Sequence, residues 1–179
     1  SLVFSNTERL EGKLDRNLDT LMKKVVEWRH DLHKYPELSN REFKTSEKVT
    51  KHLKGLGLEV KTGIAHTGVV AILEGGKPGP MVALRADMDG LPVVEKTELP
   101  FASKERDTYN GQEVGVMHAC GHDAHVSILM GVAEFLTSIR SELSGSVMFI
   151  FQPAEEGPPV GEEGGAQLML KEGIWNERK

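Results

Sequence analysis

Two short segments of the chain carry the residue types that are best suited to chemistry. Residues 117–125 read Met-His-Ala-Cys-Gly-His-Asp-Ala-His and bring together three imidazoles, a carboxylate and the only thiol of the chain. Residues 151–156 read Phe-Gln-Pro-Ala-Glu-Glu and place two adjacent carboxylates after an apolar run. Sulfur, nitrogen and carboxylate ligands in this mixture suit Zn²⁺, Mn²⁺ or Co²⁺. The segments therefore predict a metal-dependent hydrolase, in which a glutamate that does not bind metal takes a proton from water.

Each segment also has a reading without metal. Gly121 separates Cys120 from His122 and lets the backbone bend so that both side chains face one ion, and a helix N-terminus there would favour the thiolate. An isolated pair of this kind can equally be a buried, inert cysteine beside a surface histidine. Glu155 and Glu156 point to opposite sides of an extended chain, so one can bind metal while the other faces the water. The alternative is a solvated acidic loop, which the preceding buried strand disfavours.

Further ionisable residues surround these segments. Asp87 and Asp89 are two positions apart and share a face of an extended segment, so either could orient a ligand histidine. We expect a site role for Asp89, whereas the run Asp-Gly-Leu-Pro is also good turn chemistry. His118 and His125 flank the thiol and either support the site or serve in packing. The four remaining histidines are interpreted as ordinary surface or capping residues: His30, His33, His52 and His66.

Hydrophobic periodicity predicts the elements that must position these groups. Apolar residues at helical spacing predict helices over residues 15–34, 43–56, 123–139 and 164–172, and apolar runs predict strands over 58–62, 68–74, 81–85 and 146–152. Ser39 and Glu42 resemble a capping box for the second helix. Residues 93–116 give no clear pattern. The order of elements predicts an α/β fold with a mainly parallel central sheet and helices on both faces, in which sites gather beyond the carboxyl ends of strands.

Composition narrows the classes of protein that fit. The 179 residues suit one domain, and 39% hydrophobic residues can form a real core. The net charge is −5 with interspersed signs, which argues against a nucleic-acid partner. No apolar run is long enough to span a membrane, so no membrane partner is expected. The N-terminus carries no charged region followed by an apolar stretch. We expect a cytoplasmic protein and leave open a processed, periplasmic or secreted form.

Four motifs in sequence order resemble the M20 metallopeptidase family, and specifically its amidohydrolase branch of N-acyl-amino-acid, indole-acetyl-amino-acid and hippurate hydrolases. They are residues 28–39, beginning Trp-Arg-His-Asp; residues 84–92, Leu-Arg-Ala-Asp-Met-Asp-Gly-Leu-Pro; residues 117–125; and residues 151–157. The resemblance covers most of the chain. It implies a zinc-exopeptidase-like catalytic domain that hydrolyses the amide bond of N-acyl amino acids or small peptides.

The resemblance also implies roles for individual residues. It implies two divalent ions, usually zinc, manganese or cobalt, with Cys120, His122 and Glu156 at metal-ligand positions. Glu155 matches the general base and acid, and Asp89 matches the carboxylate that supports the metal centre. Members of the family are about twice as long as this chain, with a smaller lid domain that often forms a homo-oligomer and with two further histidine ligands beyond the matched positions. Residues 1–179 therefore resemble the N-terminal part of the catalytic domain, which we expect to be inactive alone.

Two other classes of protein remain open at this point. A non-catalytic metal- or partner-binding fragment, or pseudoenzyme, would fit an incomplete set of ligands. A cysteine hydrolase would use Cys120 as the nucleophile with His122 or His118 as its base, and it would resist chelators and be lost on thiol alkylation. The adjacent glutamates have no evident role in that second mechanism.

Overall fold

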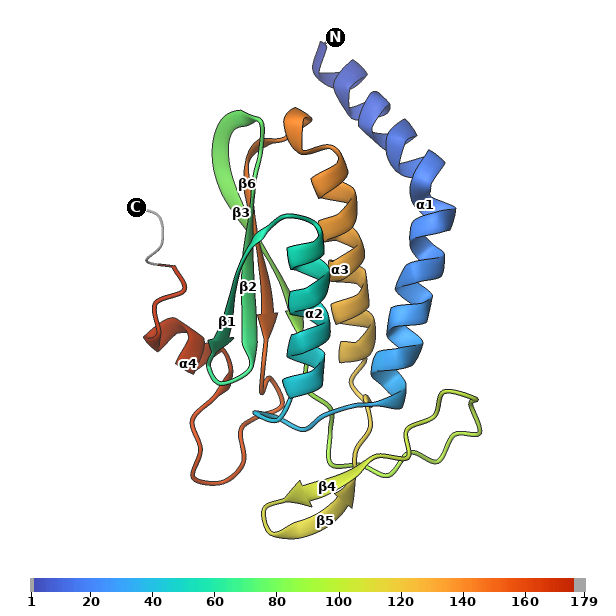
Figure 1. Ribbon diagram of the computed structural model, residues 1–179, viewed down its shortest axis with the longest axis vertical. Coiled ribbons are helices and arrows are strands. Elements are labelled where there is room, and N and C mark those ends of the chain that lie inside the picture. Colours follow the sequence, from blue (N-terminus) through green and yellow to red (C-terminus); the bar gives the residue numbers. More distant parts are fainter. Residues whose placement is uncertain (1, 176–179) are drawn as a thin grey trace.

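The computed structural model describes residues 2–175, and it places helices on both sides of a small sheet (Figure 1). The helices are α1 (Leu2–Lys34), α2 (Phe43–Gly55), α3 (His122–Ser138) and α4 (Gly165–Lys171). The strands are β1 (Glu59–Ile64), β2 (Gly68–Glu74), β3 (Lys77–Asp87), β4 (Arg106–Tyr109), β5 (Gln112–Gly115) and β6 (Ser144–Gln152). The predicted α/β class, all four helices and all four strands are thus confirmed, with shifted ends. Among the described residues, no helix combines the length and apolar character that crossing a bilayer requires.

The central sheet has the strand order β1-β2-β6-β3, and its directions correct one prediction. β1 pairs with β2 and β2 pairs with β6 in antiparallel fashion, so only the β3–β6 pairing is parallel and the predicted mainly parallel sheet is wrong. A tight turn causes the reversal between β1 and β2, where Ala65 and His66 have left-handed φ values of 47° and 78°. β3 and β6 are parallel because the long connection between them contains α3.

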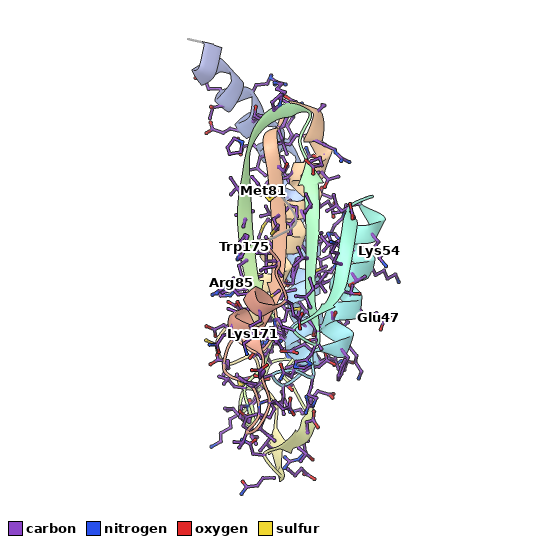
Figure 2. All side chains as sticks on the ribbon, turned by 90° about the vertical axis from the view of Figure 1, so that its left-hand side faces the viewer. Glu47, Lys54, Met81, Arg85, Lys171 and Trp175 are labelled. Carbon is purple, nitrogen blue, oxygen red and sulfur yellow. The ribbon has the colours of Figure 1, made fainter. Side chains whose placement is uncertain are left out.

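The core divides between the two faces of the sheet. One face packs against α2 and α3 and buries the larger cluster, which includes Phe149 and Phe151 of β6. α4 packs on the other face through Met169. Figure 2 shows β3 and α4 on one side of the molecule and α2, with Glu47 and Lys54 projecting outward, on the other.

Some apolar side chains at helical spacing are exposed. On α3, Ile128 is 55% exposed, and on α2, Phe43 is 61% exposed. The buried stripe of α3 instead includes Val126 and Met130, since α1, α2 and the sheet all contact this helix. Because α3 is contacted on three sides, its buried residues are not confined to the single apolar face that helical spacing indicates.

The start of α2 and the hairpin β4–β5 also differ from prediction. Glu42 makes no capping bond, and the side chain of Glu37 accepts the N–H groups of Lys44 (3.0 Å) and Thr45 (2.8 Å) instead. The predicted capping box is therefore wrong. The unassigned stretch contains the dipeptide 110–111, Asn-Gly, with φ values of 50° and 78°. That dipeptide is a strong hairpin signal, and sequence reasoning missed it.

A close approach of α1 to α3 gives the first prediction. A Cβ atom built on Gly131 would lie 2.7 Å from Cγ2 of Val25. Gly131→Val should therefore overpack this contact and lower the free energy of unfolding by about 1–3 kcal/mol. Urea unfolding followed by circular dichroism measures the change. Gly55→Val is the matched control, because its Cβ would meet nothing within 4 Å. Equal stabilities of the two variants would contradict the packing.

Candidate metal centre

Three of the four motif segments, residues 84–92, 117–125 and 151–157, meet at one end of the sheet. β3 and β6 run in parallel with Asp87 opposite Gln152, so their carboxyl ends lie side by side. α3 begins at the same end of the molecule, which is the lower end in Figure 1. Asp89 follows β3, the paired glutamates follow β6, and His122 opens α3. The predicted convergence is confirmed, and the single parallel pairing of the sheet produces it.

Cys120, His122 and Glu156 lie within reach of one ion, as predicted. One ligand atom from each side chain lies within 4.8 Å of the ligand atoms of the other two. His122 is buried, whereas Cys120 and Glu156 are exposed. Gly121 has a left-handed φ of 85° at the N-cap of α3, and this turn carries the chain from the thiol to the imidazole. The trio offers the mixed sulfur, nitrogen and carboxylate ligands that suit a divalent transition metal.

Asp89 contacts two members of the trio, His122 and Glu156, together with Glu155. Its Oδ1 accepts the N–H of Glu155 (3.0 Å), and its Oδ2 accepts the N–H of Glu156 (3.0 Å) and the hydroxyl of Ser39 (2.8 Å). Burial alone would raise the pKa of Asp89, but hydrogen bonds from His122, Ser39 and these two N–H groups outweigh it and lower that pKa. Asp89 is therefore buried and ionised beside the trio, and its support of a metal centre stays a prediction.

The geometry of His122 leaves one ring nitrogen for metal. Its Nδ1 lies 2.8 Å from the backbone oxygen of Asp89 and 3.3 Å from Oδ1 of the same residue. A neutral ring with Nδ1 protonated keeps its lone pair on Nε2, which lies 3.7 Å from Oε2 of Glu155. Burial lowers the pKa of His122, but the bonds and charge of Asp89, with the charge of Asp87, raise it to about 9. The same negative field favours a metal cation.

The thiol differs from its prediction. The hydrogen bond to Glu156 is the largest cause that raises the pKa of Cys120, followed by burial and by the charges of Glu156, Glu155 and Asp89. The expected thiolate at a helix N-terminus is thus outweighed by neighbouring carboxylates. A divalent cation on the sulfur reverses that balance, because a coordinating thiol loses its proton.

Comparison with known proteins identifies the family to which this arrangement corresponds. The model of the peptidase family M20/M25/M40 matches residues 83–179, which include the whole trio. The chain belongs to this family. The M20 chain is 45% identical over 168 residues to thermostable carboxypeptidase 1 of Saccharolobus solfataricus, covering 93% of this chain and 40% of that protein. It is 40% identical over 162 residues to an N-acyl-L-amino acid amidohydrolase of Geobacillus stearothermophilus, covering 90% and 40%.

A solved structure from the same family has a similar fold. The M20 chain superposes on the YxeP protein of Bacillus subtilis, described as a dinuclear metal-binding peptidase of the M20 family, with a TM-score of 0.76 and 41% identity. The match covers 88% of this chain and 41% of that one. The M20 chain therefore spans about 40% of the length of the relatives that it matches.

A second group of ligand atoms lies beside the first. Asp87, His122 and His125 each offer one atom within 4.8 Å of the other two. Nδ1 of His125 lies 3.6 Å from Oδ2 of Asp87. Oδ1 of Asp87 is buried and receives no well-directed hydrogen bond, although Nε of Arg85 lies 3.2 Å away. Sequence reasoning left Asp87 and His125 open, and the structure of the M20 chain brings them together.

A buried glutamate that sequence reasoning assigned to a helix cap instead contacts the site. Glu42 accepts the N–H of Ala154 (2.8 Å) with Oε1 and the hydroxyl of Thr67 (2.5 Å) with Oε2. Burial is the largest influence and raises the pKa of Glu42 to about 7, against the lowering effect of these bonds. Ala154 has a left-handed φ of 48°, which costs a residue other than glycine about 1–2 kcal/mol. The structure thus holds a strained residue directly before Glu155.

The histidines outside the trio have more varied surroundings than predicted. His33 is buried, with Nδ1 2.9 Å from Oδ2 of Asp123 and Nε2 3.2 Å from Oε1 of Glu95, so its surface interpretation is wrong. It ties α1 to the residue that follows His122. Both ring nitrogens of His118 are buried without a hydrogen-bond partner among the described residues, and burial lowers its pKa to about 4. His118 is thus a neutral packing residue next to the site.

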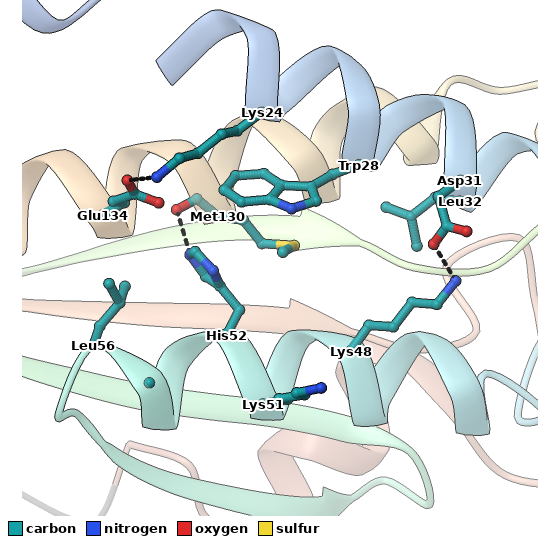
Figure 3. Close-up of a pocket in the computed structure, with 11 residues that line it drawn as sticks. Lys24, Trp28, Asp31, Leu32, Lys48, Lys51, His52, Leu56, Met130 and Glu134 are labelled. Carbon is teal, nitrogen blue, oxygen red and sulfur yellow. Dashed lines mark hydrogen bonds and ion pairs between the residues drawn. The ribbon is translucent and has the colours of Figure 1, made fainter. Parts of the chain in front are cut away.

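The M20 chain also has a cavity of about 580 Å³ that lies apart from the trio, between α1, α2 and α3 (Figure 3). Two ion pairs lie on its rim: Lys24 binds Glu134, and Lys48 binds Asp31. Nε2 of His52 lies 3.0 Å from the backbone oxygen of Met130. None of the trio lines this cavity. The candidate metal site is therefore separate from the cavity and lies on the open surface at the carboxyl ends of β3 and β6.

The raised pKa of Glu42 gives a stability prediction. The folded chain keeps the carboxyl protonated up to about pH 7, whereas the unfolded carboxyl ionises near 4.5. The higher proton affinity of the folded state stabilises the fold. This contribution to the free energy of unfolding is complete below pH 4.5 and is lost as the pH rises toward 7. Glu42→Gln cannot ionise, so its stability relative to wild type should rise by about 3 kcal/mol between pH 4.5 and pH 8. Urea unfolding with a chelator present measures this. A difference that is independent of pH would contradict the assignment.

Proposed function

We propose that this chain forms the metal-binding part of the catalytic domain of an amidohydrolase that cleaves the amide bond of N-acyl amino acids or small peptides. The observation that carries the proposal is the trio Cys120, His122 and Glu156 with Glu155 beside it. A bound divalent cation would polarise the scissile carbonyl and make a water molecule more acidic. Zinc, manganese and cobalt all suit the ligands.

The residues of this chain divide into distinct tasks around such an ion. Glu155 has a partly exposed side chain, and its Oε2 lies 3.7 Å from the ligand nitrogen of His122. It can therefore accept a proton from water at the metal and return it to the leaving amine. Asp89 fixes the ring of His122 through Nδ1 and fixes the backbone of both glutamates. Cys120 binds metal and does not attack the substrate.

The relatives support the substrate class without narrowing it. Their names include an N-acyl-L-amino acid amidohydrolase and a carboxypeptidase, and both activities break an amide bond next to a carboxylate-bearing residue. The chain spans about 40% of those proteins. The full-length protein would add the remaining ligands and the groups that select the acyl chain and the amino acid.

Two alternative classes of protein, a cysteine hydrolase and a non-catalytic binding protein, can be distinguished from the proposed amidohydrolase. A cysteine nucleophile needs a readily ionised thiol, whereas the carboxylate of Glu156 raises the pKa of Cys120. That observation disfavours the cysteine hydrolase. A non-catalytic binding protein would retain the trio but show no turnover in the full-length protein with metal added, so activity under a chelator-controlled assay separates it from the proposal.

The general base gives the direct test. In the full-length protein, Glu155→Gln should lower kcat by about 10²–10⁴-fold, because the amide keeps the shape but cannot accept a proton. Metal content, measured by mass spectrometry of the dialysed protein, should remain that of wild type. Glu47→Gln is the matched control on the exposed face of α2. Near-normal turnover of Glu155→Gln on N-acyl amino acids would remove Glu155 from the mechanism.

We also propose that two ions bind, as the description of the YxeP protein states for that relative. Since only Nε2 of His122 is free, this ring can serve one ion, and Asp87 with His125 remain as candidate ligands for the second. Mutating both to asparagine should lower the manganese content of the full-length protein from two ions to one. His66→Asn, a histidine outside both groups, should keep two. Loss of both ions, or of neither, would contradict this assignment.

A further inference from the structure

Three successive backbone N–H groups in the loop after β6 all donate to buried carboxylates. The N–H of Ala154 donates to Oε1 of Glu42 (2.8 Å), that of Glu155 to Oδ1 of Asp89 (3.0 Å) and that of Glu156 to Oδ2 of Asp89 (3.0 Å). The loop carries the general base and a metal ligand of the proposed site. The backbone of the loop is thus fixed by two buried side chains, Glu42 and Asp89, that come from other parts of the sequence.

Glu42 meets the proposed site through the backbone of this loop, at Ala154. It has no exposed surface, and its second oxygen accepts the hydroxyl of Thr67 (2.5 Å), which prevents the carboxyl group from turning away. Asp89 differs, because it also contacts His122. A change at Asp89 would therefore affect both the ring of His122 and the loop. A change at Glu42 would affect the backbone of the loop at Ala154 and would leave the side chains of Cys120, His122 and Glu156 chemically unchanged.

The conformation of the loop explains why it needs this support. Ala154 adopts a left-handed φ of 48°, which residues other than glycine rarely adopt. Ala154 opens a turn that contains the two glutamates and is closed by the N–H of Gly157 donating to the oxygen of Ala154 (3.3 Å), so its conformation affects where their side chains point. With the N–H of Ala154 unpaired in a buried position, the turn would relax toward an ordinary conformation, and the glutamates would move relative to His122.

We propose that Glu42 is a positioning residue that holds the left-handed turn at Ala154 and thereby aims Glu155 and Glu156 at the metal. The role rests on the proposed function, because it presumes that Glu156 binds the ion. It calls for a residue at position 42 that accepts the N–H of Ala154 and contacts the hydroxyl of Thr67. Glutamine can do both, since its side chain has an acceptor oxygen and a donor nitrogen, whereas alanine can do neither.

The first test measures metal affinity in this chain by Co²⁺ titration, following the absorption band of the cobalt–thiolate bond to Cys120. Glu42→Ala should weaken Co²⁺ binding by about 10–100-fold, the range for loss of a group that orients a ligand. Glu42→Gln should stay within about threefold of wild type. Gly131→Val, which destabilises the fold at a distant contact, should bind Co²⁺ like wild type and so controls for stability. Wild-type affinity in Glu42→Ala, or an equal loss in Glu42→Gln, would overturn the proposal.

The second test does not depend on metal. Amide hydrogen exchange by nuclear magnetic resonance should show protection of residues 154–156 falling at least tenfold in Glu42→Ala, with α3 unchanged and with Glu42→Gln like wild type. Unchanged protection in Glu42→Ala would overturn the positioning role even where cobalt binds. If the wild-type chain bound no Co²⁺ while exchange followed the expected pattern, Glu42 would still hold the turn, but neither the proposed metal site nor its aiming by Glu42 would stand.

Discussion

The buried carboxylate of Asp89 is the interaction on which the rest of the site depends. A charge removed from water is costly unless hydrogen bonds replace its hydration. Ser39, the N–H groups of Glu155 and Glu156, and the ring of His122 supply those bonds. These donors come from three separate regions of the chain. The requirement to solvate one carboxylate therefore ties the loop before α2, the end of β6 and the start of α3 into one arrangement.

The sheet can bring these regions together only because one of its pairings is parallel. β3 and β6 end side by side, with Asp87 opposite Gln152, and the connection through α3 returns the chain to the same end. The antiparallel pairings of β1 and β2 add core but contribute no ligand. We expected a mainly parallel sheet to bring the acidic loops together. One parallel pair of strands, joined by a single crossover, is sufficient to do so.

The sequence predicted those parts of the site whose partners are close along the chain. Cys120 and His122 are separated by one glycine, and Glu155 adjoins Glu156, so spacing alone indicated their chemistry. Glu42 could not be found in this way, because its partner Ala154 lies 112 positions away, and its spacing from Ser39 suggested a helix cap. His33 was missed for the same reason, since Asp123 is 90 positions away. Strand direction also escaped prediction, because an apolar run has the same pattern whichever way its neighbour runs. The Asn-Gly turn of β4–β5 was readable and was overlooked.

The burial of these groups separates two kinds of residue within the centre. Cys120, Glu155 and Glu156, which would meet metal or water, are exposed, whereas the ligand His122 and the supporting residues Asp89 and Glu42 are buried. An exposed side chain on a loop keeps many rotamers, and ordering it on an ion costs conformational entropy. The backbone of the loop would add to that cost, but buried carboxylates that fix three consecutive backbone N–H groups restrict it before the ion arrives. The placement of acidic residues beneath the loop, and not only within it, is therefore what would allow an open surface site to bind metal tightly.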